Sequence, residues 1–223
     1  MSQTQWTAVD RYFTETLVPS DAVLDAALQA NGEAGLPTID VAPNQGKFLQ
    51  LLVQLRGARR ILEIGTLGGY SSIWMARALP ADGHLTTLEF SPKHAEVARA
   101  NIARAGLQKI VEIRVGPALE TLANMEKEGT EPFDLIFIDA DKPNNPNYLP
   151  WALKFSRPGT LLIGDNIVRE GEVADPSSTD PNVQGQRRFL ELVAAEPRLS
   201  ATALQTVGSK GYDGFAMALV LGE

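Results

Sequence analysis

Residues 60–76 read RILEIGTLGGYSSIWMA, and this stretch decides the expected fold. It opens with a short apolar run typical of a buried strand, passes through a turn with three glycines, and ends in a helical pattern. Four more apolar runs follow, separated by helix-like stretches. Such repetition predicts parallel strands joined by right-handed crossovers, with helices on both faces of the sheet. The expected strands are RILEI (60–64), HLTTLEF (84–90), IVEIRV (110–115), FDLIFID (133–139) and TLLIGD (160–165).

Residues at the ends of the intervening stretches support helices between these strands. Ser91-Pro92 has the form of an N-cap residue followed by proline at the first helical position. Gly106, Gly129 and Gly159 stand where three helices would end, since glycine favours helix termination. The expected helices are YSSIWMARAL (70–79), PKHAEVARANIARAG (92–106), PALETLANMEKEG (117–129) and NYLPWALKFSRPG (147–159).

The two ends of the chain depart from this alternation. A helix is expected over 181–197, then strands over 201–207 and 214–222 joined by the link GSKGYD. Two successive strands with a tight link predict an antiparallel hairpin at one end of the sheet, which brings the expected strands to seven. Residues 1–57 read as two or three helices with a Gly- and Pro-rich loop over 32–46. They form either an appended arm or lid, or helices packed on the core.

Length and composition predict one α/β domain with a Rossmann-like, mostly parallel sheet. The chain has 223 residues, of which 44% are hydrophobic and 21% charged, the balance of an ordinary globular domain. We expect a single domain over 1–223, made of an N-terminal helical arm (1–57) and a core (58–223).

Charge and cysteine usage exclude several classes of function. The net charge of −7 argues against nucleic acid and anionic membrane as partners. The absence of cysteine removes disulfides, thiolate metal sites and cysteine nucleophiles, and it is compatible with the cytoplasm. The N-terminus lacks a signal-peptide pattern, and no apolar run approaches the roughly 18 residues of a membrane span.

The glycine turn after the first expected strand favours a ligand without phosphates. Leu67 occupies the place where a dinucleotide turn has its second glycine, and its side chain would obstruct a pyrophosphate. Glu63 would repel phosphate but could face a cation. Glu89 ends the next strand, 24 residues after Gly65, where an acid can bind both ribose hydroxyls. A cationic nucleoside without phosphates is S-adenosylmethionine (SAM), although such a turn can also be purely structural.

Two neighbouring strands are expected to end in acidic residues. Asp139 ends one strand and Asp165-Asn166 the next, and parallel neighbours bring such ends to within about 5 Å in the backbone. Buried carboxylates this close need a cation between them. Two carboxylates and an amide oxygen suit a hard divalent ion, Mg²⁺ first, with Ca²⁺ or Mn²⁺ as alternatives. Capping of the next helix would also explain an aspartate, and for Asp141 we favour that role or exposure to solvent.

Lys142 is the candidate general base on the same rim. A cation and a cationic cofactor nearby would disfavour its charged form, although a surface ion pair is the alternative. His84 opens a strand at the opposite end, and His94 is expected to be solvated in the first turn of a helix.

The chain resembles a known family at these residues, the cation-dependent, SAM-dependent O-methyltransferases of the catechol and caffeoyl-CoA group. The resemblance runs from about residue 36 to the end. It implies a SAM-methyltransferase core and a homodimer formed through the sheet edge and N-terminal helices. Trp6, Tyr12 and Phe13 are either anchors for that contact or ordinary core residues. The matching blocks are LEIGTLGGYSS (62–72), LTTLEFSP (85–92), VGPALETL (115–122), FDLIFIDADK (133–142) and GTLLIGDN (159–166).

The resemblance also implies roles for individual residues. The implied SAM contacts are Val41, Glu63, Gly65, Thr66, Ser71, Glu89, Ala118 and Asp139. The implied metal ligands are Asp139, Asp165 and Asn166, and the implied catalytic residues are Lys142 as base and Asp139.

Two stretches depart from the family pattern. PNNPNY (143–148) follows the lysine, with Asn145 where the plant enzymes have an aromatic residue. The composition of 167–185 suggests a mobile loop at the rim of the acceptor pocket. The acceptor is therefore expected to be a small catechol-type or phenolic molecule whose identity these stretches determine.

The sequence thus predicts a metal-assisted transfer of the SAM methyl group to a hydroxyl. The alternatives are a SAM- or nucleoside-binding protein without methyl transfer, and a methyltransferase acting on a different small-molecule hydroxyl. An NAD-dependent dehydrogenase is disfavoured by Leu67 and Glu63.

Overall fold

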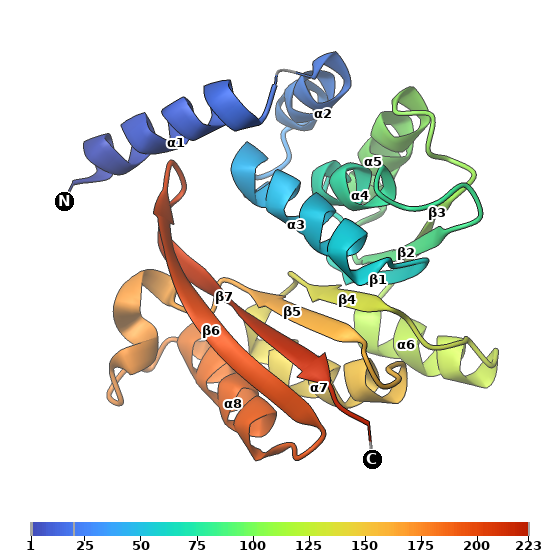
Figure 1. Cartoon of the computed structure of the whole chain (residues 1–223), viewed down its shortest axis with the longest axis vertical. Helices are drawn as coiled ribbons and strands as arrows, with labels where there is room; N and C mark the ends of the chain where they lie inside the picture. Colours follow the sequence, from blue (N-terminus) through green and yellow to red (C-terminus); the bar gives the residue numbers. More distant parts are fainter. Residues whose placement is uncertain (1, 20, 223) are drawn as a thin grey trace.

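Eight α-helices, two short 3₁₀ helices and seven strands alternate along the chain in the computed structural model, which describes residues 2–19 and 21–222 (Figure 1). The strands are β1 (Arg60–Ile64), β2 (His84–Glu89), β3 (Val111–Val115), β4 (Leu135–Ile138), β5 (Leu161–Asp165), β6 (Leu199–Gly208) and β7 (Gly211–Val220). The α-helices are α1 (Gln3–Leu17), α2 (Ala22–Glu33), α3 (Pro43–Arg56), α4 (Tyr70–Ala76), α5 (Pro92–Arg104), α6 (Ala118–Lys127), α7 (Asn145–Lys154) and α8 (Pro181–Ala195). The 3₁₀ helices are η1 (Lys142–Asn144) and η2 (Arg169–Ala174).

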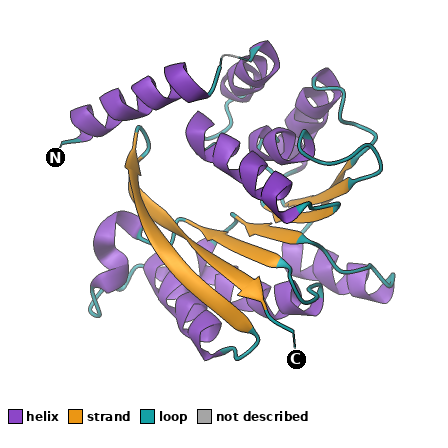
Figure 2. Ribbon diagram, in the orientation of Figure 1, coloured by secondary structure: helices purple, strands orange, loops and turns teal. Residues whose placement is uncertain are grey.

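One seven-stranded sheet forms the centre of the molecule, in the order β3-β2-β1-β4-β5-β7-β6. Strands β1 to β5 are parallel, and β7 is antiparallel to both β5 and β6 (Figure 2). This confirms the predicted mostly parallel sheet with a C-terminal hairpin. The chain proceeds outward from β1 in one direction and from β4 in the other. The crevice at the carboxyl ends of β1 and β4 is therefore the place where this architecture binds ligands.

Alternation along the strands builds a core on each face of the sheet. Ile61 joins a cluster with the helices on the side of α3 and α4, whereas Leu62 and Ile64 join the cluster on the side of α6, α7 and α8 (Figure 1). Glu63 points to the same face as Ile61, because successive side chains of a strand alternate. Its carboxyl group is therefore directed toward α4.

Two of the three N-terminal helices pack on the core, and the third projects away from it. Helices α2 and α3 contribute Leu24, Leu49 and Val53 to the core beside α4. Helix α1 buries only Asp10 and lies beside the tip of the β6–β7 hairpin (Figure 1). Helices α2 and α3 are therefore packed on the core, whereas α1 forms an arm. No helix among the described residues is long and apolar enough to cross a bilayer.

Three connections differ from the sequence expectation. The hairpin link is only Ser209-Lys210, because β6 and β7 stay paired from Gly208 to Gly211. The helix expected from Asn147 begins earlier, since η1 starts at Lys142 and runs directly into α7. The expected mobile loop over 167–185 contains η2 and the first turn of α8. That turn is capped by the Asp180 side chain, which accepts from the backbone N–H of Asn182.

Candidate functional site

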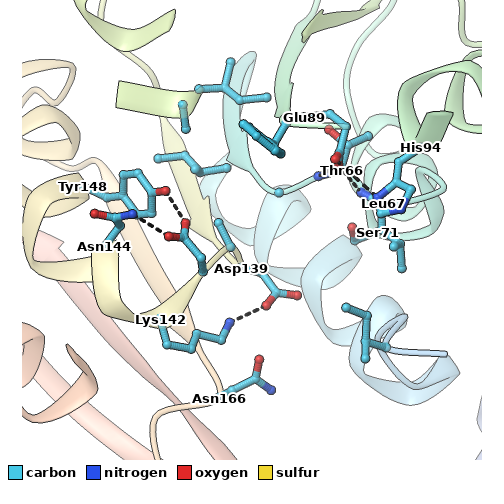
Figure 3. A pocket seen from close by; sticks show the side chains of 18 of the residues that line it. Thr66, Leu67, Ser71, Glu89, His94, Asp139, Lys142, Asn144, Tyr148 and Asn166 are labelled. Atoms are coloured by element: carbon cyan, nitrogen blue, oxygen red, sulfur yellow. Dashed lines mark hydrogen bonds and ion pairs between the residues drawn. The ribbon is translucent and has the colours of Figure 1, made fainter. Parts of the chain in front are cut away.

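A cavity of about 720 Å³ opens at the carboxyl ends of the parallel strands, where the strand order reverses (Figure 3). Its size is that of a small-molecule site. The structure brings most of the predicted residues to its wall: Val41, Gly65, Thr66, Ser71, Glu89, Ala118, Asp139, Lys142 and Asn166. Two predicted residues, Glu63 and Asp165, lie behind this wall and are almost fully buried.

The turn after β1 is shaped by two unusual backbone positions. Gly65 has φ +103°, and a Cβ atom there would collide with the carbonyl oxygen of Asp139. Only glycine fits, because the turn passes directly against the end of β4. Leu67 adopts φ +48°, which is costly for a residue with a side chain. Strained backbone of this kind gathers at ligand sites.

The Glu89 carboxylate is held in place by backbone N–H groups. Its Oε2 accepts from Leu67 N at 2.8 Å and Thr66 N at 3.3 Å, and its Oε1 accepts from Ser91 N at 2.8 Å. Because a carboxylate has about four acceptor positions, it can still accept from ligand hydroxyls. The carboxylate is thus presented to the cavity in a fixed orientation (Figure 3).

His94 belongs to the site, contrary to the sequence expectation that it is solvated. It lines the cavity, and its Nδ1 lies 3.4 Å from Glu89 Oε1. The available signal was its place in the first turn of the helix that follows β2, since the starts of such helices face the ligand crevice.

Glu63 is a buried support rather than a wall residue. Ser71 Oγ donates to its Oε1 at 2.5 Å, and Ser72 Oγ donates to its Oε2. Burial raises the pKa of Glu63 to about 7, against the opposing effect of the hydroxyl donors, and the charge of Asp139 adds to the rise. Ser71, which does line the cavity, stands between Glu63 and the open space.

The acidic ends of β4 and β5 meet as predicted. Ile138 pairs with Gly164, so Asp139 and Asp165 follow at the same edge of the sheet. Lys142 Nζ donates to Asp139 Oδ1 at 2.7 Å (Figure 3). Burial raises the pKa of Asp165 to about 7, and the charge of Asp139 adds to the rise while Lys142 opposes it. The three charged groups therefore influence one another across this edge.

The neighbours of Asp165 fix its orientation. Gln45 Nε2 donates to Oδ2 at 2.6 Å, and the backbone N–H of Asn166 donates to Oδ1 at 2.8 Å. Asn166 itself has φ +55°. Asp165 and Asn166 also line a second cavity of about 240 Å³, beside the β6–β7 hairpin. Among residues 2–19 and 21–222, no three His, Cys, Asp or Glu side chains gather as a metal cluster.

Asp141 is exposed, which is one of the two roles that the sequence favoured, but its side chain makes no capping hydrogen bond to the helix that follows. It also reveals residues that the sequence did not identify. Its carboxylate accepts from Tyr148 Oη and from Asn144 Nδ2, each at 2.5 Å. Burial, followed by the neighbouring Asp141, raises the pKa of the Tyr148 hydroxyl above its ordinary value. Tyr148 and Asn144 both line the cavity, as do Arg169 and Asn182. All four fall in the two stretches that depart from the family pattern.

Comparisons with known proteins agree with this geometry. A family model described as O-methyltransferase matches residues 15–219. The chain is 56% identical to catechol O-methyltransferase of Niastella koreensis over 213 residues, which is 96% of each protein. It is 51% identical to catechol O-methyltransferase of Mycobacterium tuberculosis, over 95% of this chain and 94% of that one.

Two solved structures carry the same fold at high identity. The O-methyltransferase from Bacillus cereus in complex with S-adenosylhomocysteine (SAH) is 65% identical with a TM-score of 0.97, covering 98% of this chain and all of that one. The O-methyltransferase TomG from Streptomyces achromogenes in complex with SAM is 53% identical with a TM-score of 0.96, and both chains are fully covered. Both relatives thus hold the cofactor or its product in a fold that superimposes on this chain.

Proposed function

Since the chain belongs to the O-methyltransferase family and is therefore a SAM-dependent enzyme, we propose that it methylates a hydroxyl of a small catechol-type or phenolic acceptor with the help of a divalent cation. The observation that carries this proposal is the meeting of Asp139, Lys142 and Asp165 at the adjacent ends of β4 and β5, beside the cavity. Relatives named catechol O-methyltransferase support the acceptor class.

The residues of the cavity wall fit SAM. The turn at Gly65 and Thr66 lines the cavity, and the Leu67 side chain beside it would obstruct a pyrophosphate. The fixed Glu89 carboxylate suits the ribose hydroxyls. The proposed cofactor contacts are Val41, Gly65, Thr66, Ser71, Glu89, Ala118 and Asp139, with Glu63 acting through Ser71.

The donor set at the strand ends fits a hard divalent cation such as Mg²⁺. Asp139, Asp165 and Asn166 offer carboxylate and amide oxygens, which such ions prefer. Burial first and the charge of Asp139 second raise the pKa of Asp165, and Lys142 only partly opposes them. When bound, the cation would offset this repulsion and lower the pKa of an acceptor hydroxyl.

Lys142 is the proposed general base. Its side chain is largely buried and lines the cavity, with Nζ held by Asp139. In its neutral form, which a bound cation and the cationic cofactor would favour, Nζ takes the hydroxyl proton. The acceptor oxygen then forms a bond to the methyl carbon as the carbon–sulfur bond of SAM breaks. Opposite charges disappear together in this step, so positioning of the two reactants supplies most of the rate enhancement.

We also propose that the enzyme pairs with a second copy through α1 and β6. Tyr12 is 65% exposed and Leu204 is 52% exposed on these two elements, which lie in contact. The net charge of −7 argues against nucleic acid as a partner.

The test is methyl transfer to catechol, followed by mass spectrometry with and without EDTA. We expect turnover that EDTA abolishes and Mg²⁺ restores. Asp165→Ala should lose at least about a hundredfold in kcat/KM, since it removes one of two carboxylate ligands. Asp82→Ala, at an exposed ion pair with Arg59, is the matched control and should keep full activity. Turnover that persists in EDTA would remove the cation from the proposal. Binding of SAM without transfer to any phenol would favour the binding-protein alternative.

A further inference from the structure

Among the charged side chains that line the cavity, Arg169 differs in having no hydrogen-bond or ion-pair partner within the described residues. The others are all paired. Lys142 binds Asp139, His94 lies beside Glu89, Asp141 accepts from Tyr148 and Asn144, and Asp40 accepts from Asn31. No hydrogen bond or ion pair to the Arg169 guanidinium is found within residues 2–19 and 21–222.

The unpaired group is not simply exposed to water. Arg169 is half-buried, and its Nε is shielded from solvent without a hydrogen-bond partner. Buried donors are nearly always satisfied, so an unpaired Nε needs an explanation. One carboxyl group that senses the charge of Arg169 is Asp180, whose pKa is lowered mainly by the backbone N–H of Asn182 and only to a smaller extent by Arg169. Asp180 therefore caps α8 and does not neutralise the guanidinium directly.

The backbone at Arg169 is held in an unfavourable conformation. Arg169 has φ +52° and Glu170 has φ +55°, both in the left-handed region. The Asp213 carboxylate fixes this bend by accepting from Val168 N at 3.0 Å and Arg169 N at 3.1 Å. The bend follows Asn166 by three residues, at the acceptor end of the cavity. Conformations of this kind persist where the surrounding structure holds a ligand contact in place.

We propose that Arg169 binds a carboxylate of the acceptor, so that the preferred substrate is an aromatic diol that carries a carboxylate group. The inference rests on the proposed function, since it concerns the acceptor of that reaction. The planar guanidinium matches a carboxylate through two parallel hydrogen bonds. A single negative charge also suits this wall better than a phosphate dianion, because Asp139 and Asp141 lie on the same wall and would repel the larger charge.

The experiment compares two diols that differ only in this charge, 3,4-dihydroxybenzoate and 3,4-dihydroxybenzamide. Wild-type protein, Arg169→Gln and Arg169→Lys are assayed for kcat/KM with each. We expect Arg169→Gln to lose roughly ten- to a hundredfold on the acid, the size of a charge-assisted pair, and less than about threefold on the amide. Arg169→Lys should fall between, since it keeps the charge and loses the planar fork. Calorimetry of the acid with SAH-loaded protein should show the same loss in affinity.

Turnover of the amide is the internal control for folding, because it requires an intact site. Arg188→Gln is the matched charge control, since Arg188 is 60% exposed on α8 and pairs with Glu191. An equal loss on both diols, or no loss on the acid, overturns the role of Arg169 and leaves the methyltransferase intact. If wild-type protein methylates neither diol, the proposed function itself fails.

Discussion

Glu63 illustrates how burial controls the charge of a single carboxyl. Its pKa of about 7 lies above the ordinary 4.5, so the folded protein binds more protons than the unfolded chain between these values. Stability from this residue is therefore fully present below pH 4.5 and is lost as the pH rises to 7. The loss corresponds to about 3 kcal/mol in the free energy of unfolding.

Glu63→Gln should remove this pH dependence, because the amide does not titrate. We expect the cofactor-free variant to gain stability over wild type at pH 8, and to gain little at pH 5. Urea unfolding at the two pH values measures the difference. Glu112→Gln, a half-exposed strand residue, is the control. Parallel pH slopes for wild type and the Glu63→Gln variant would show that Glu63 is not the titrating group.

Some residues of the site could be predicted from the sequence, and others could not. Asp139, Lys142 and Asp165 were identified because each follows an apolar strand, and strand ends are readable from hydrophobic pattern. Tyr148 was missed although a helix was expected over 147–159, since the pattern does not tell which side chain of that helix reaches the cavity. Arg169 was missed because it lies in a connection that carries no periodic signal. The burial of one residue can be inferred from its neighbours in the sequence. The meeting of side chains from distant segments on one cavity wall cannot.

At the level of elements, α8 links the acidic end of β5 to the segment that follows β4. Gln186 is fully buried, and its Nε2 donates to the carbonyl oxygens of Asp165 at 2.9 Å and Asn166 at 3.1 Å. Its Oε1 accepts from Asn145 at 3.0 Å. A Cβ at Gly185 would collide with the carbonyl oxygen of Lys142. One turn of this helix thus supports the candidate metal ligands and the candidate base together.

Gln186→Met should destabilise the protein by about 3 kcal/mol, because it leaves several buried carbonyl and amide groups unsatisfied at nearly constant volume. The measurement is the free energy of unfolding in urea. Gln184→Met, at an exposed glutamine of the same helix, is the control. A loss no larger than that of the control would mean that water replaces the Gln186 amide.

The strands and helices themselves followed closely from the sequence. β1 was predicted over 60–64 and found there, because an apolar run between polar flanks fixes both ends. The β6–β7 hairpin was predicted, but its strands are longer than the apolar pattern indicated. Most residues of β6 are exposed on both faces of the strand, so its sequence shows no sustained alternation of apolar and polar residues. The extension of the pairing to Gly208 therefore could not be detected.

At the scale of the whole molecule, α1 and β6 leave an apolar surface open. β6 is an edge strand of ten residues, and long uncovered edges tend to pair with another chain. On α1, Tyr12 and Leu17 are 65% and 67% exposed, whereas Trp6 is half-buried. Of the three candidate anchors, Tyr12 and Phe13 are thus available to a partner.

Sedimentation velocity should give the mass of two chains, and Tyr12→Glu combined with Leu204→Glu should give the mass of one, because two charges would enter an apolar contact. Val115→Glu, at the opposite edge of the sheet, should remain paired. A wild-type protein that sediments as one chain at micromolar concentration would contradict the proposed homodimer.

Because the strand order reverses at the site, the cofactor-binding residues and the acceptor-facing residues come from separate parts of the sequence. The proposed cofactor contacts from Gly65 to Ala118 follow β1, β2 and β3, whereas the acceptor-facing residues from Lys142 to Arg169 follow β4 and β5. Asp139 stands at the boundary, against Gly65. New acceptors can therefore be acquired by substitutions within one contiguous stretch of coding sequence that keep Lys142, Asp165 and Asn166, with the SAM contacts before it left unchanged. The proposed SAM contacts from Gly65 to Ala118 thus precede Asp139 in the sequence, whereas the proposed base Lys142 and the residues that select the acceptor follow it.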